Sequence, residues 1–287
     1  MTYRATHITT YSYSSSVSIC HNEVHLHPRR TQRQSVRRSD LKVEPAPNYI
    51  HRHNDYFGNP VSYFAILGAH NKLVVTSESI VDVTPFELPG AGLTAPWEVV
   101  RDEVAMHETS ESLDAFQYLF DSPHVKSGPE FAEFALPSFP EGRCIFEAAK
   151  DLCHRIGMEF KYDKGSTSIS TPAEEVLRAR HGVCQDFAHV MIGCLRALRI
   201  PARYVSGYLR SGPKMIGAEA SHAWVSAYCS GTGWIDFDPT NDVTPSGNHL
   251  TVAWGRDYSD VTPVRGVAIG GGEQTIAVAV SVVPTLE

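Results

Sequence analysis

In the first third of the chain, β-branched and aromatic residues alternate with polar ones. This period of two predicts β-structure from residue 3 to about residue 83, with one strand at 7–13. Two further runs, 61–67 and 73–83, flank Gly68-Ala69-His70-Asn71 and predict a hairpin. No catalytic constellation appears in this part of the sequence.

Helical spacing takes over in the second third. A short helical or irregular aromatic segment is expected at 113–120, a short helix over 129–136 and a longer one over 141–156. The longer one has apolar residues at i, i+4, i+7 and i+11, and Gly157 suits the position just past its end. A further helix is predicted to begin at Thr171-Pro172-Ala173-Glu174, with the threonine as its cap.

The central helix is predicted to begin near Cys184. Four of its apolar residues again lie on one face, which we expect to pack into the core: Phe187, Met191, Cys194 and Leu198. Strands are predicted at 202–209, 222–229 and 234–237. A last strand at 275–283 is expected to complete a sheet in the same part of the molecule.

The strands that follow the central helix lead from His222 to Asp238. Because side chains alternate along a strand, these two residues can meet only if even-numbered positions pair with even-numbered ones. A plain four-residue loop would pair odd positions with even ones. We therefore predict a three- or five-residue turn, or a bulge near Gly231 or Gly233.

A segment rich in proline and glycine separates the β-rich part from the rest. We place a domain boundary there. Residues 1–84 are predicted to form an N-terminal antiparallel β domain, 85–96 a linker and 97–287 a second domain. The fold class is α+β.

Composition and charge exclude some classes of partner. The hydrophobic content of 42 %, the charged content of 20 % and the net charge of −7 are ordinary for a soluble globular protein and give no reason to expect nucleic acid or an anionic membrane. No stretch reaches ~18 apolar residues and Met1-Thr2-Tyr3-Arg4 begins no apolar leader, so we expect a cytoplasmic protein.

Two local clusters are interpreted as structural. The basic cluster is expected to be a solvated face, because the net charge is against phosphate binding: Arg29, Arg30, Arg33, Arg37 and Arg38. The histidines at 21, 25 and 27 have no fourth ligand at a clear spacing, so we expect solvent-facing strand histidines and no metal.

Among six cysteines, none of which has a Cys-x-x-Cys spacing, Cys184 stands out. It follows His181-Gly182-Val183 and opens a helix, where unsatisfied N–H groups and the positive end of the helix dipole favour a thiolate. With His222 and Asp238 it offers a nucleophile, a base and an orienting acid. Cys144, Cys153, Cys194 and Cys229 are expected to be structural thiols.

These motifs resemble the core of the bacterial transglutaminase-like superfamily. The resemblance is carried by the segments Thr171 to Leu177, His181 to His189, Ile200 to Tyr208, Ser221 to Val225 and Gly233 to Thr240. The β-rich first third, with Asp55-Tyr56-Phe57-Gly58-Asn59, resembles the N-terminal domain that precedes this core in many bacterial members.

The resemblance implies a papain-like core with a Cys-His-Asp triad. Matched by motif, the nucleophile is Cys184, the base His222 and the acid Asp238, which lies four residues after a tryptophan and directly before Pro-Thr. The calcium-site features of animal transglutaminases are not recognisable, so no metal or other cofactor is expected. Members of the superfamily include cross-linking enzymes, proteases, amidases and inactive binding modules.

Neighbouring residues receive other roles. Asp236 shares strand parity with Asp238 and is the alternative acid, whereas Asp186 faces away from Cys184 and is interpreted as a helix first-turn charge or hydrogen-bond anchor. The oxyanion hole is expected to use the backbone N–H of Cys184 and, as a candidate second donor, the hydroxyl of Tyr162. Trp224 is expected to shield the triad from water.

Three functional hypotheses remain open. The first is a thiol enzyme that hydrolyses peptide or related amide bonds in a peptide or protein substrate; transamidation to an amine is its variant. The second is a binding module without turnover. The third is a metal site built from Cys184, His181, His189 and His222, which matches no standard zinc spacing.

Overall fold

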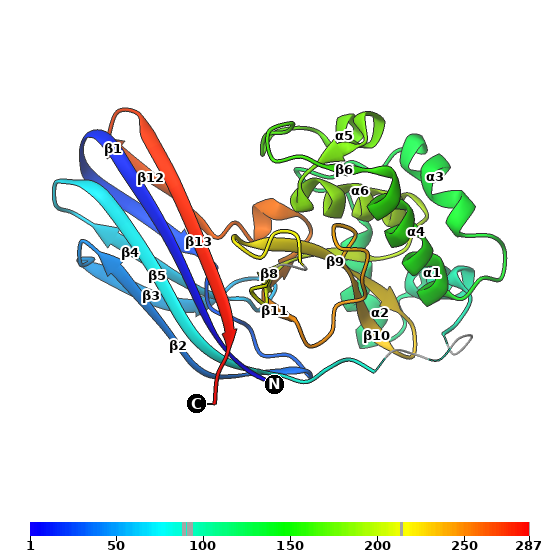
Figure 1. The fold of residues 1–287 in the computed structure, drawn as a ribbon. Coiled ribbons are helices and arrows are strands. Elements are labelled where there is room, and N and C mark those ends of the chain that lie inside the picture. The colour runs from blue at the N-terminus through cyan, green and yellow to red at the C-terminus, as the bar shows by residue number, and fades with distance from the viewer. Residues whose placement is uncertain (88–89, 91–93, 213–214, 287) are drawn as a thin grey trace.

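The computed structural model describes residues 1–87, 90, 94–212 and 215–286. Figure 1 shows a long twisted sheet that holds both chain termini, beside a second part in which helices cover a smaller sheet. The predicted α+β fold class is therefore confirmed. One apolar core extends across both parts, because Tyr3, Val81 and Val282 of the long sheet pack with the helices.

The long sheet is organised around one strand of 23 residues. Its strands are β1 (Thr2–Val24), β2 (Gln34–Glu44), β3 (Tyr49–Asn54), β4 (Pro60–Ile66), β5 (His70–Val83), β12 (Val264–Gly270) and β13 (Gln274–Pro284). β4 pairs with β1 along Cys20–Val24, and β5 pairs with it mainly along Thr2–Ser12. Both run antiparallel to β1, so the chain continues in one direction between them. The predicted hairpin is wrong.

The predicted position of the last strand is also wrong. β12 and β13 pair with β1, along Val17–Val24 and Tyr3–Tyr13, and Figure 1 shows them beside β1 rather than in the smaller sheet. The long β1 offers an eleven-residue ladder to β13, more than a short strand of the other sheet could. The domain limits remain a prediction, and residues 88–89 and 91–93 of the linker lie outside the described residues.

The second part contains six α-helices and a four-stranded sheet in the described ranges. The helices are α1 (Trp97–Met106), α2 (Ser110–Phe116), α3 (Pro129–Ala135), α4 (Ile145–Glu159), α5 (Ala173–Ala179) and α6 (Cys184–Ala197). The sheet has the order β10-β9-β8-β11, with β8 (Ala202–Leu209), β9 (His222–Cys229), β10 (Gly233–Phe237) and β11 (His249–Gly255). A parallel pair, β6 (Lys161–Tyr162) and β7 (His181–Gly182), leads to α6.

The helix predictions are right in type and wrong in some details. α4 continues through Gly157 to Glu159, because the Phe160 N–H still donates a helical hydrogen bond to the Ile156 carbonyl. Gly157 therefore lies within the helix, not past its end. Thr171 does not cap α5. Its hydroxyl accepts the Ser168 N–H instead, and Pro172 holds the cap position without a side-chain bond.

The hairpin between β9 and β10 has the predicted register. Trp234 lies opposite Tyr228 and Asp236 opposite Ser226, so even positions pair with even ones. The turn between Cys229 and Gly233 has three residues, one of the two lengths that parity allows.

Two surface predictions are wrong in part: Arg30, Arg37 and Arg38 are exposed as expected, but other members of the two clusters are covered. His25 and His27 are buried, since His25 lies 3.3 Å from the Asp55 carboxylate and His27 shares hydrogen bonds with two serine hydroxyls. Arg29 and Arg33 are not a solvated face either: Arg29 stacks 3.3 Å from the Trp254 ring centroid, and Arg33 lies over Phe86. Local pattern could not show these contacts, because residues elsewhere in the chain, such as Asp55, Ser62 and Trp254, cover these side chains.

The six cysteines are free thiols. Cys194, Cys153 and Cys229 are buried as expected, whereas Cys144 is half-buried at the start of α4. No helix in the described part of the chain is long and apolar enough to cross a membrane.

Candidate active site

Cys184 is the first residue of α6 and is partly accessible. The extended residue Val183 turns the chain into the helix, and its N–H donates to Asp186 Oδ2 at 2.8 Å. Thr167 donates to the same oxygen at 2.6 Å. Asp186 therefore anchors the start of the helix, while the unpaired first-turn N–H groups and the helix dipole favour negative charge at the thiol.

Tyr162 lies beside this helix start. β6 pairs with β7, which places Tyr162 opposite Gly182, two residues before Cys184. Burial, followed by the charges of Cys184 and Asp186, raises the pKa of Tyr162 to about 12. The phenol thus keeps its proton at neutral pH and can donate a hydrogen bond near the thiol.

His222 and Asp238 are brought together where the neighbouring strands β9 and β10 of the smaller sheet begin and end. His222 begins β9, Asp238 follows β10, and His222 Nε2 donates to Asp238 Oδ2 at 2.8 Å. Both side chains are fully buried. Burial lowers the pKa of His222, but the charges of Asp238 and Cys184 outweigh this effect and raise that pKa to about 10. The other ring nitrogen, Nδ1, makes no hydrogen bond of normal length among the described residues, and the Cys184 thiol is close enough to the His222 ring to help raise its pKa.

The Asp238 carboxylate is saturated with donors. Oδ1 accepts the backbone N–H groups of Thr240 and Asn241, and Oδ2 also accepts the Asn241 side-chain amide at 2.9 Å. Burial raises the pKa of Asp238, but the charge and hydrogen bonds of His222 and His249 hold it well below its usual range. Asp238 is therefore a fixed anion that can orient one face of His222.

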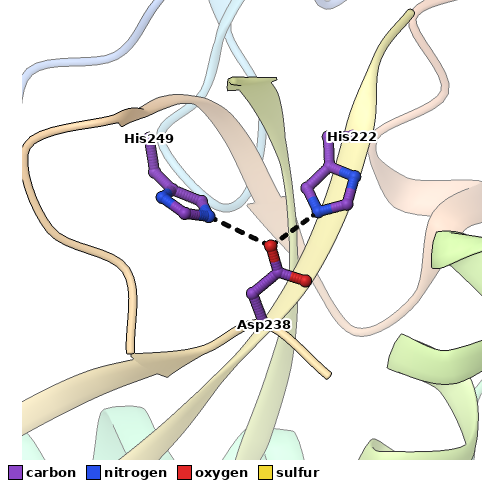
Figure 2. Close-up of side chains that lie close together, drawn as sticks. All are labelled: His222, Asp238 and His249. Carbon is purple, nitrogen blue, oxygen red and sulfur yellow. Dashed lines mark hydrogen bonds and ion pairs between the residues drawn. The ribbon is translucent and has the colours of Figure 1, made fainter. Parts of the chain in front are cut away.

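A second imidazole lies on the same carboxylate (Figure 2). His249, the first residue of β11, donates from Nε2 to Asp238 Oδ2 at 3.1 Å. Sequence analysis missed it. The one available signal is its place at the start of a strand, as with His222, but which strand faces Asp238 depends on the pairing of β11 with β8.

Two imidazoles and a carboxylate are also a donor set that zinc accepts. The ligand atoms of His222, Asp238 and His249 lie within 4.8 Å of one another. Both nitrogens, however, are at hydrogen-bond distance from one oxygen, so N–H protons occupy the space that an ion would need. The residues fit a hydrogen-bonded network better than a metal site.

A loop covers the free nitrogen of His222. A Cβ on Gly217, whose φ is +89°, would lie 2.7 Å from His222 Nδ1. The loop is fastened to the acid, since Asn241 exchanges two hydrogen bonds with the Ile216 backbone. A cavity of about 460 Å³ adjoins Gly217 and is also lined by Lys164, Met215, Glu219 and Val280. The larger hollows lie at the long sheet and at the junction of the two parts.

Of the remaining candidates, Asp236 and His189 have other partners than the His222–Asp238 pair, whereas Trp224 packs against it. Asp236 is 3.7 Å from Arg33. His189 is buried against His124 and accepts the Tyr258 N–H, and burial lowers its pKa to about 3. Trp224 is fully buried and packs against His222 and His249, with ring centroids 6.2 and 5.2 Å away.

Two family patterns match the chain. The bacterial transglutaminase-like N-terminal region matches residues 3–82, and the transglutaminase-like superfamily matches residues 140–239. The second match contains Cys184, His222 and Asp238.

Two relatives resemble the chain over nearly its whole length, and a third resembles a short part of it. Uncharacterised proteins of Mycobacterium bovis and Mycobacterium tuberculosis are each 40 % identical over 298 residues, covering 98 % of this chain and 92 % of the relative. A protein-glutamine gamma-glutamyltransferase of Pseudomonas aeruginosa is 38 % identical over 72 residues, 23 % of this chain and 11 % of that protein.

A solved structure shares the fold. It is described as a candidate cysteine protease from Cytophaga hutchinsonii, with a TM-score of 0.78 and 23 % identity, covering 100 % of this chain and 91 % of that chain. At this identity the likeness supports the fold alone.

Proposed function

The chain belongs to the transglutaminase-like superfamily, and we propose that it is a thiol-dependent acyl-transfer enzyme that hydrolyses peptide or related amide bonds. Cys184 is the nucleophile, His222 the base and Asp238 the orienting acid. The observation that carries the proposal is the buried His222–Asp238 pair, whose free ring nitrogen is left for a thiol at a helix N-terminus.

The chemistry follows from these positions. The Cys184 thiolate attacks the carbonyl carbon of the substrate, and the backbone N–H of Cys184 stabilises the oxyanion, with the Tyr162 hydroxyl as candidate second donor. The C–N bond breaks, His222 gives its proton to the leaving amine and a thioester forms. Water then attacks the thioester, His222 takes a proton from it, and the thiol and a carboxylic acid are released.

Transamidation is the alternative fate of the thioester. A primary amine in place of water would give a new amide, as in the activity named for the Pseudomonas aeruginosa relative, which matches only a quarter of this chain. We favour hydrolysis because water is always present, whereas an exclusive amine acceptor requires a dedicated subsite.

The first test needs no substrate. Iodoacetamide alkylation of Cys184 is followed by peptide mass spectrometry from pH 5 to 9, with the half-buried Cys144 as internal reference. Wild type should react at pH 6 at least about tenfold faster than His222→Ala, while Cys144 reacts equally in both. Equal, slow reaction of Cys184 in both proteins would instead favour a binding module.

The second test separates the two chemistries. Peptide mixtures are incubated with the protein, with or without a biotinylated primary amine, and products are compared with those of Cys184→Ala. Hydrolysis products that require Cys184 support the proposal. Biotin incorporation without hydrolysis would make the protein a transamidase, and full turnover by Cys184→Ala would exclude Cys184 as nucleophile.

A further inference from the structure

Two side-chain amides of the long sheet's part cover the edge of β11. Gln34 donates to the Thr251 carbonyl at 2.7 Å and accepts the Thr251 N–H at 2.9 Å. Asn59 donates to the Trp254 carbonyl at 2.8 Å and accepts the Trp254 N–H at 2.9 Å. One edge of β11 pairs with β8. At its other edge, each side-chain amide makes the pair of hydrogen bonds that a neighbouring strand would otherwise make.

Further contacts fix both ends of this strand. Tyr3 donates its hydroxyl proton to the Gly247 carbonyl at 2.8 Å, and the Phe86 N–H donates to Ser246 Oγ, just before β11 begins. At the far end the Arg29 guanidinium stacks on Trp254. Gln34 and Asn59 are themselves buried, so these bonds are shielded from competing water.

The strand held in this way begins with His249. Its ring is buried, packs edge-on against Trp224 and reaches Asp238 Oδ2. A continuous set of contacts therefore leads from Gln34 through β11 and His249 to the acid that faces His222.

We propose that His249 is a positioning residue for Asp238 and that the N-terminal sheet part, through Gln34 and Asn59, holds β11 in the register that this requires. This rests on the function proposed above. His249 donates to Oδ2, the oxygen that His222 also contacts, whereas the backbone N–H groups donate to Oδ1, so donors on both oxygens oppose rotation of the carboxylate. The N-terminal sheet part would then support catalysis by positioning Asp238, without contacting the substrate.

The variant His249→Leu removes the donor, and His249→Gln keeps an N–H group at a similar reach. We expect the Cys184 alkylation rate at pH 6 to fall about tenfold or more in His249→Leu and to recover substantially in His249→Gln. Cys144 is the internal reference and thermal melting the check on folding. A second measurement does not depend on the variants: ¹⁵N-histidine NMR of the wild-type protein should show a proton on His249 Nε2.

Gln34→Leu tests the connection to the sheet part, with the exposed neighbour Gln32→Leu as matched control. We expect Gln34→Leu, and not Gln32→Leu, to lower Cys184 reactivity at pH 6 several-fold in folded protein. If Gln34→Leu lowered the melting temperature but left the pH dependence of Cys184 alkylation unchanged, the sheet part would only stabilise the fold. That result would overturn this half of the proposal.

The outcomes separate this inference from the proposed function. If His222→Ala lowers Cys184 reactivity but His249→Leu does not, or if His249 Nε2 carries no proton, His249 has no positioning role and the thiol enzyme stands. If wild-type Cys184 shows no dependence on His222, the proposed function is wrong and the role of His249 in it is excluded as well.

Discussion

The Asp186 carboxylate packs directly against Gly182, so that a Cβ on Gly182 would lie 2.6 Å from Asp186 Oδ2. That oxygen accepts the Val183 N–H and the Thr167 hydroxyl, the bonds that fix the start of α6. The glycine before Cys184 is therefore explained by the space that the anchoring carboxylate needs.

Gly182→Ala should displace Asp186 and loosen the helix start. We expect a loss of on the order of 1–3 kcal/mol in the free energy of unfolding, measured by urea denaturation, and slower alkylation of Cys184 at pH 6. Gly68→Ala is the control, since a Cβ there meets nothing within 4 Å. Equal behaviour of the two variants would show that Asp186 does not constrain the site.

Asp238→Asn should reduce turnover on any substrate that the peptide screen identifies. An asparagine keeps the shape of the side chain but offers an amide that can stabilise the wrong tautomer of His222, an effect on the order of 10⁴-fold in a serine protease triad. We expect kcat/KM to fall by about 10³–10⁴-fold. Asp236→Asn, which changes the other candidate acid, should stay within about threefold of wild type. Reversal of this order would make Asp236 the catalytic acid.

His189→Gln should make stability less dependent on acid pH. Burial lowers the pKa of His189 from 6.5 to about 3. Below pH 6.5 this histidine is therefore protonated in the unfolded chain but stays neutral in the folded protein. The stabilisation present above pH 6.5 is therefore lost as the pH falls towards 3. Between pH 7 and 4.5 wild type should lose more free energy of unfolding than the variant, by on the order of 1–3 kcal/mol.

Urea denaturation at each pH measures this difference, and exposed His51→Gln should behave like wild type. If the free energy of unfolding changed with pH equally in wild type and His189→Gln, His189 would not be held neutral in the folded protein.

The parts of the site that follow from local rules were predictable from sequence. Cys184 opens a helix because a glycine turn precedes an apolar period of 3.6 residues. The pairing of even positions in the β9–β10 hairpin follows from requiring that His222 and Asp238 meet. In both cases a few neighbouring residues contain the needed information.

What depends on distant pairing was not predictable. Gly68-Ala69-His70-Asn71 indicates a chain reversal, but β4 and β5 both add to β1, which begins some sixty residues earlier. β13 pairs with β1 from the other end of the chain. His249 was missed for the same reason, since its contact with Asp238 is set by the β8–β11 register and by the amides that cover β11.

Gly217 provides a test of whether the free nitrogen of His222 matters. A Cβ there would lie 2.7 Å from His222 Nδ1 and would crowd that nitrogen. Gly217→Ala should therefore reduce Cys184 alkylation at pH 6 about as far as His222→Ala does.

Backbone strain must be separated from this steric effect, because the φ of Gly217 is +89° and alanine is disfavoured there. Gly231→Ala is a matched control: its φ is +76°, and its Cβ would meet nothing within 4 Å. Both variants should lose about 1 kcal/mol of stability by strain, but only Gly217→Ala should lose reactivity at Cys184. If the two variants kept the same alkylation profile, the nitrogen beside Gly217 would not be the one that serves the thiol, and the orientation of His222 proposed here would be wrong.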